Sequence, residues 1–175
     1  MMSPLTWSAI YWIIVMFSGV NTVAKSFIAE KKGVDIYLFS IADPQDVILS
    51  KLIYNAVLCL LMSTVCFGLF VMFFGNPVAD INTFSLVVIL ASIGFSATFT
   101  MLSGIASKSA NSNVIMAVMS FPVIISVLML AVKLTKNCID GLDPSVSTND
   151  LLTLGAIDAL MVALSYMLFP FVWRS

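Results

Sequence analysis

The chain has 175 residues, of which 61% are hydrophobic and only 10% charged, and its mean hydropathy is +1.09. Soluble domains carry roughly 45–50% apolar and about 25% charged residues, so this composition excludes a soluble fold. The net charge is −1, and no basic cluster exists beyond Lys31 and Lys32, so nucleic acid is not an expected partner. We predict an all-α polytopic membrane protein, a bundle of apolar helices whose main environment is the lipid bilayer.

The residue types argue against chemistry performed by this chain. It contains no histidine, which removes the commonest metal ligand and the usual general base. Cys59 and Cys66 lie seven residues apart, about 10 Å along a helix, which is too far for a disulfide. We interpret both as small buried residues, and we place Cys138 in a polar loop without a role. No catalytic residue, metal site or enzymatic activity is expected.

Five segments are long and apolar enough to cross a bilayer, and together they form a single domain covering residues 1–175. They are Trp7 to Ile28, Val47 to Phe74, Phe84 to Ala106, Asn113 to Leu134, and Leu151 to Trp173. The polar or glycine-rich and proline-rich breaks between them fall at residues 29–46, 75–77, 107–109 and 137–150.

The lysines and the arginine predict the orientation, because basic residues favour the cytoplasmic side. Six flank the first loop, the third loop or the C-terminus, and two flank the fourth loop: Lys25, Lys31, Lys32, Lys51, Lys108 and Arg174 against Lys133 and Lys136. The first loop, the third loop and the C-terminus should therefore be cytoplasmic. The N-terminus would then lie outside without a signal sequence to carry it there, so we expect that an upstream helix is missing from this sequence.

The first loop carries an apolar segment between Gly33 and Pro44. Its members are Ile36, Tyr37, Leu38, Phe39 and Ile41. Two interpretations remain open. The segment is either an amphipathic helix that anchors the loop at the membrane surface, or a docking element for the groove of a cytoplasmic partner.

A few polar residues interrupt the spans. Asp158 is the only acidic residue well inside a span, and an intramembrane carboxylate is by default a functional hypothesis, although its place near the outer end of the span could let it reach water. Asn21 and Asn55, with Thr22 and Ser63, either line a path or join helices by hydrogen bonds. Pro122 should kink the fourth span.

The first loop also carries a family resemblance, through Glu30, Gly33, Leu38, Pro44, Ser50 and Lys51. This order resembles the permease subunits of ABC-2 type exporters. The order of the whole chain resembles the haem exporter protein B family, the permeases of the cytochrome c maturation system. The stretches that fit this family are residues 49–53, 73–75, 92–97, 102–106, 119–125 and 154–175.

The resemblance implies the function. It implies a membrane permease subunit of an ABC-type haem exporter in a bacterial inner membrane, with haem as the substrate and ATP bound by a separate cytoplasmic subunit. Other cytochrome c maturation membrane proteins would be partners, and no cofactor is assigned to this chain. The residues that would couple it to the ATPase are Glu30, Gly33, Ile36, Tyr37, Leu38, Phe39 and Pro44, within a cytoplasmic coupling loop at residues 29–46.

Three points stay open at this stage. Family members have six spans with both termini cytoplasmic, whereas this chain offers five. Haem could be translocated, or only released to a chaperone by ATP-driven work. A permease for a lipid, drug or polysaccharide, or a membrane scaffold without transport, would be the alternative functions.

Overall fold

The computed structural model describes residues 2–28, 44–106 and 112–174, with side chains described for 2–23, 45–103 and 122–167. Within these ranges every regular element is an α-helix, which confirms the predicted fold class. The helices are α1 (Pro4–Ile28), α3 (Pro44–Phe74), α4 (Ile81–Ala106), α5 (Ser112–Ile139) and α6 (Pro144–Arg174). Each of these five described helices is long and apolar enough to cross a membrane.

The first three helices begin one turn before the apolar segments that predicted them. Their first turns contain proline or polar residues, which hydropathy excludes but helix starts favour. In α1, the Ser3 hydroxyl accepts a hydrogen bond from the backbone amide of Thr6 at 3.2 Å, and Pro4 occupies the first helical position. Helix α3 likewise begins with Pro44.

Asp80 caps the start of α4. Its Oδ1 accepts hydrogen bonds from the backbone amides of Asn82 at 3.1 Å and Thr83 at 3.2 Å. Hydrogen bonding to Thr83, first through its side chain and then through its backbone, holds the pKa of Asp80 below the ordinary value. The charged carboxylate therefore lies at the positive end of the α4 dipole.

The predicted fourth loop, residues 137–150, is wrong in extent. Helix α5 continues to Ile139 and α6 begins at Pro144, so the connection is only residues 140–143. Gly141 has a φ of 65°, and the amide of Leu142 donates to the carbonyl of Asn137 at 3.2 Å, which closes the end of α5. The polar residues that suggested a loop pair across the two helices instead, because Asn137 Nδ2 donates to the hydroxyl of Ser147 at 3.2 Å.

The placement of Cys138 in a polar loop is also wrong. Cys138 lies in the last turn of α5 and is buried. Its carbonyl accepts hydrogen bonds from the amides of Ala79 at 3.1 Å and Asp80 at 3.3 Å, so it attaches the α3–α4 connection to α5.

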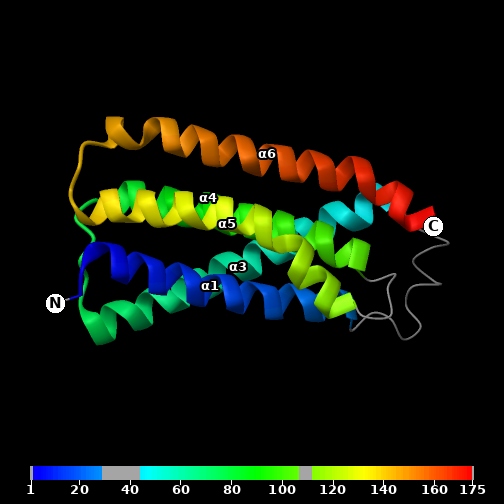
Figure 1. Ribbon diagram of the computed structural model, residues 1–175, viewed down its shortest axis with the longest axis horizontal. Coiled ribbons are helices and arrows are strands. Elements are labelled where there is room, and N and C mark those ends of the chain that lie inside the picture. The colour runs from blue at the N-terminus through cyan, green and yellow to red at the C-terminus, as the bar shows by residue number, and fades with distance from the viewer. Residues whose placement is uncertain (1, 29–43, 107–111, 175) are drawn as a thin grey trace.

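Helix α4 is the centre of the bundle and contacts all four other helices. The helices run along the long axis of the molecule, with the chain termini at opposite ends (Figure 1). We call the end where α1 starts and α3 finishes the Gly75 end, and the end where α3 starts the Pro44 end. The ribbon of α5 bends away from the rest of that helix near its beginning (Figure 1), in agreement with the proline, Pro122, inside it.

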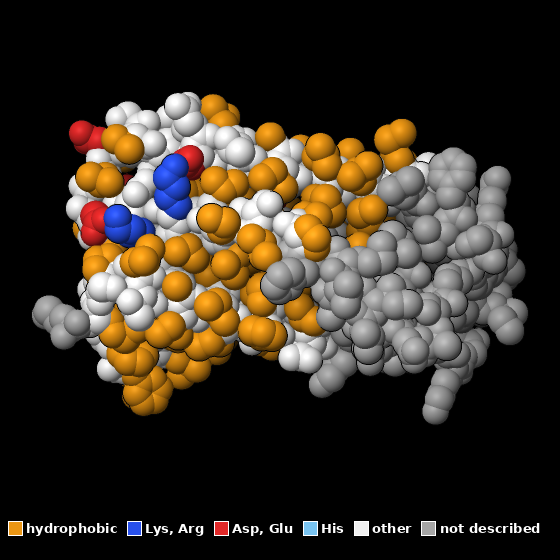
Figure 2. Space-filling view, viewed as in Figure 1, with side chains coloured by type: hydrophobic (Ala, Val, Ile, Leu, Met, Phe, Trp, Pro, Cys, Tyr) orange, Lys and Arg blue, Asp and Glu red, His pale blue; other side chains and the backbone are white. Residues whose placement is uncertain are grey.

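The surface has the character expected of a lipid-facing bundle. Apolar side chains cover much of the described face in Figure 2, while its visible charges gather at the Gly75 end. Two ion pairs lie at this end, Lys133–Asp150 at 2.7 Å and Lys136–Asp140 at 3.5 Å. The lipid-facing side of α3 is especially apolar, with exposed Ile53, Tyr54, Val57, Leu61, Val65, Leu69, Met72 and Phe73.

A buried hydrogen bond fixes α1 against α5. The indole Nε1 of Trp12 donates to the hydroxyl of Thr135 at 2.8 Å, and both side chains are fully buried. Thr135→Val should leave that indole without a partner and lower the free energy of unfolding by about 1 kcal/mol. Equilibrium unfolding in mixed micelles measures this loss.

Thr64→Val is the matched control, since Thr64 is exposed and bonds only to the carbonyl of Leu60 in its own helix. Equal stability of the two variants would contradict the assigned role of the Trp12 bond.

Candidate functional site

Most of the predicted coupling residues lie outside the described residues. These are Glu30, Gly33, Ile36, Tyr37, Leu38 and Phe39. Pro44, the last of the set, is the first residue of α3. The segment between α1 and α3 therefore ends directly at the start of a membrane-spanning helix.

The polar residues of α3 lie against a stripe of hydroxyls on α4. Asn55 Nδ2 donates to Thr100 Oγ1 at 2.9 Å, and the hydroxyls of Ser63 and Ser92 lie 3.2 Å apart. All four side chains are fully buried. On α4, Ser96 lies between Ser92 and Thr100, and its hydroxyl donates to the backbone carbonyl of Leu52 on α3 at 3.2 Å.

The hydroxyls share one face of α4 because they are spaced four residues apart. Asn55 and Ser63 thus join α3 to α4, the helix-joining alternative offered by the sequence. The four-residue spacing of Ser92, Ser96 and Thr100 is visible in the sequence and could have predicted this stripe on α4.

Asn21 does not join this set. Its side chain is exposed, and Nδ2 donates to the carbonyl of Phe17 at 3.0 Å within α1. Asn55 and Asp158 are buried, so the structure does not bring the three predicted intramembrane residues together.

Asp158 is enclosed by the bundle. It is 4% exposed, and among the described residues neither oxygen of its carboxyl has a hydrogen-bond partner. The alternative that it reaches water at the outer end of its span disagrees with this structure, because the bundle buries the side chain. Asp158 lies fourteen positions after Pro144, the first residue of α6, which places it about 21 Å along the helix axis.

Gly94 makes room for this carboxyl on α4. A Cβ at Gly94 would overlap Asp158 Oδ1 and would lie 3.3 Å from both Asp158 Cγ and Val127 Cγ1. Helices α4, α5 and α6 therefore meet at one point, where only glycine fits beside the carboxyl. A buried carboxylate without a partner costs free energy, and such groups persist mostly at functional positions.

The Asp158 niche and the Asn55 contact are separate places. Gly94 and Thr100 are six residues apart on α4, which corresponds to about 9 Å along the helix axis. Among the described residues, the interior thus holds a hydrogen-bonded polar seam between α3 and α4, in which only Asn55 Oδ1 lacks a partner, and an unpaired carboxyl between α4 and α6.

The Pro44 end ties α3 to α6. Tyr166 OH donates to Gln45 Oε1 at 3.0 Å, one residue after the start of α3. Deeper in the bundle, one apolar cluster joins α3, α4 and α6, and its buried members are Ile48, Leu52, Ala97 and Met161. The Tyr166 contact could not be predicted from sequence patterns, since 121 residues separate its partners.

Comparison with known proteins identifies one relationship. The family model described as CcmB protein matches residues 2–174, nearly the whole chain. No curated protein and no solved structure matches this chain.

The Gly94–Asp158 contact can be tested by a double-mutant cycle. Gly94→Ala should lower the free energy of unfolding by about 1–3 kcal/mol, because the new methyl group overpacks the junction of three helices. In an Asp158→Ala background the cost should fall by at least about 0.5 kcal/mol, since the overlapping carboxyl is gone. Unfolding in mixed micelles gives all four values, and additive effects would contradict direct contact.

Proposed function

The chain belongs to the CcmB protein family, and on that basis we propose that residues 29–46 and helix α3 couple a partner ATPase to the handling of haem. The family is the membrane subunit of a haem exporter in cytochrome c biogenesis. The chain is accordingly a permease subunit rather than an ATPase, and a multi-pass protein of the bacterial inner membrane.

The energy comes from a separate ATP-binding subunit. The sequence lacks a G-x-x-x-x-G-K-[ST] phosphate loop, so this chain does not bind ATP by that means. The ATPase docks on the apolar side chains of the first loop, with Tyr37 and Phe39 as aromatic anchors. Closure of the ATPase moves the loop and, through Pro44, the start of α3.

The contacts of α3 carry the proposal further into the bundle. The hydrogen bond between Gln45 and Tyr166, at 3.0 Å, is the observation that supports it most directly, because it links the residue next to the loop to α6. The buried contact of Asn55 with Thr100 links the same half of α3 to α4. A displacement of α3 at Pro44 therefore acts on α4 and α6 together, the two helices that enclose Asp158 and Gly94.

Haem is the proposed substrate. Rearrangement of α3, α4 and α6 would either carry haem across the bilayer or drive its release to a chaperone with the other cytochrome c maturation proteins. Both outcomes depend on the same coupling loop, so a variant that detaches the ATPase from this loop should prevent both.

Removing the aromatic anchors should detach the ATPase. Truncating an aromatic anchor of an interface commonly costs at least about 2 kcal/mol of binding, so Tyr37→Ala with Phe39→Ala should release the partner. Holo-cytochrome c should then be lost, since this subunit has no other energy source. Co-purification from membranes and haem staining of cytochrome c measure the two effects.

Asp43→Asn is the control, because apolar docking does not depend on that charge, and membrane abundance of each variant shows that insertion is unchanged. A double mutant that still binds the ATPase and assembles cytochrome c normally would mean that the loop only anchors itself at the membrane.

The orientation with a cytoplasmic C-terminus is open to labelling. In a variant without its native cysteines, Ser145→Cys should react with an impermeant maleimide in intact spheroplasts, and Ser40→Cys only after lysis. Ser145 is suitable because it is exposed in the first turn of α6, whereas Ser147 is buried. The reverse labelling pattern would invert the proposed topology.

A further inference from the structure

A cavity of about 590 Å³ lies at the Gly75 end of the bundle, the end opposite the proposed ATPase contact. Three helix ends form it: the start of α1, the end of α3 with the connection that follows, and the end of α5. Its lining residues are Met2, Pro4, Trp7, Phe73, Phe74, Gly75, Asn76, Pro77 and Ile139. The volume lies within the range of about 300–1,000 Å³ usual for small-molecule sites.

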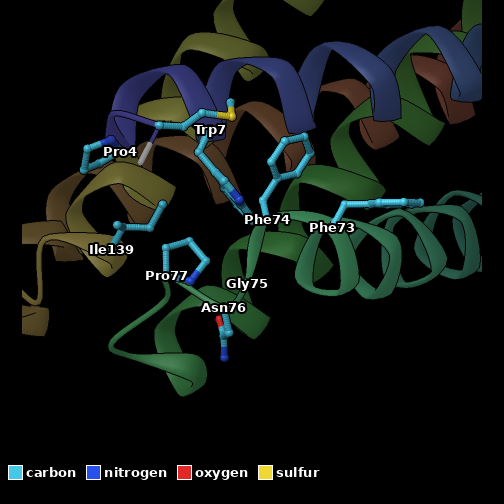
Figure 3. A pocket seen from close by; sticks show the side chains of 9 residues that line it. Pro4, Trp7, Phe73, Phe74, Gly75, Asn76, Pro77 and Ile139 are labelled. Atoms are coloured by element: carbon cyan, nitrogen blue, oxygen red, sulfur yellow. The ribbon is translucent and has the colours of Figure 1, made fainter.

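One polar group in this cavity has no partner. The Trp7 side chain is 3% exposed, and its Nε1 makes no hydrogen bond. Figure 3 shows the indole extending from α1 into the space between Phe74 and Pro77. Its neighbours hold it there, since it stacks on Tyr11 with centroids 5.5 Å apart and meets Phe70 edge to face at 5.4 Å.

The other two buried aromatic donors of α1 are satisfied. Tyr11 OH donates to the carbonyl of Ser63 at 3.1 Å, and Trp12 Nε1 donates to Thr135. Buried indole N–H groups normally find an acceptor, because leaving one unmade costs free energy. Trp7 thus lines the cavity with an indole whose covered N–H has no acceptor among the described residues, so a ligand that displaced the side chains covering it would meet an unsatisfied donor.

The lining determines what kind of acceptor fits. None of the described lining residues is charged, so within the described part of the wall no cation holds an anionic group, and a neutral acceptor is favoured. The rim is continuous with the lipid-facing side of α3, since Phe73 is 76% and Phe74 58% exposed. The candidate span of α1 begins beside the cavity, and those of α3 and α5 end there; lipid ester groups lie at the boundary of the hydrocarbon, where membrane spans begin and end.

We propose that this cavity binds an acyl chain of a membrane phospholipid, whose ester carbonyl accepts a hydrogen bond from Trp7 Nε1. The chain fills the apolar space between α1, α3 and α5, and the headgroup remains at the interface. The site is independent of the proposed coupling loop and lies at the opposite end of the molecule.

The hydrogen bond can be tested with paired lipids. Purified, delipidated protein is titrated with dioleoyl phosphatidylethanolamine or with its dialkyl ether analogue, which lacks the carbonyl, and bound lipid is counted by native mass spectrometry. The wild-type protein should bind the ester lipid about two- to tenfold more tightly than the ether lipid, the value of one net hydrogen bond. In Trp7→Phe the two lipids should bind equally.

Two further variants complete the experiment. Ile139→Trp places a larger ring in the wall of the cavity and should weaken the binding of both lipids, with the milder Ile139→Phe used if the tryptophan variant does not fold. Phe17→Leu, at an exposed position on α1 outside the cavity, should behave as wild type.

Other results would overturn the proposal. An ester preference that persists in Trp7→Phe, or lipid binding unchanged by filling the cavity, would show that phospholipid does not occupy this site. A Soret band on adding haemin, lost in Trp7→Phe and Ile139→Trp while phospholipid binding is unaffected, would assign the cavity to haem instead.

Discussion

Helix α4 is buried from Gly94 to Thr100 without an exposed position, and the other helices are arranged around this constraint. A helix enclosed on all sides must pack closely and satisfy its polar groups within the bundle, because the hydrocarbon offers neither hydrogen bonds nor a hydrophobic driving force between helices. Small residues meet the first need, since a glycine at position 94 lets α6 approach with its carboxyl against the α4 backbone. The hydroxyls of Ser92, Ser96 and Thr100 meet the second through α3.

Hydropathy predicted the number of described spans and their order, because about 20 apolar residues are needed to cross a bilayer whatever the tertiary packing. It failed where helices extend into polar sequence. The end of α5 and the start of α6 read as one long loop, although Asn137 and Ser147 pair with each other inside the structure. The same error shortened the predicted distance of Asp158 from the start of its helix, since the polar first two turns of α6 were left out of its length.

The pairing of side chains could not be predicted from the sequence. A helix that is apolar on nearly every side gives little indication of which face turns inward, so its rotation is decided by the packing of its neighbours. Asn21 and Asn55 are similar polar interruptions in the sequence, yet one turns outward and bonds to its own helix, while the other meets Thr100 in the interior. Contacts such as that of Trp12 with Thr135, 123 residues apart, exist only after this rotation is set.

Two of the unpartnered buried groups, Asp158 and Trp7, are supported by different surroundings. Trp7 is neutral, and its lost hydrogen bond is a small cost beside the aromatic contacts with Tyr11 and Phe70. Asp158 has no such compensation among the described residues, because a carboxyl without a hydrogen bond is more expensive to bury than an indole N–H. A movement of α6 relative to α4 that gave this carboxyl water or a cation would lower that cost.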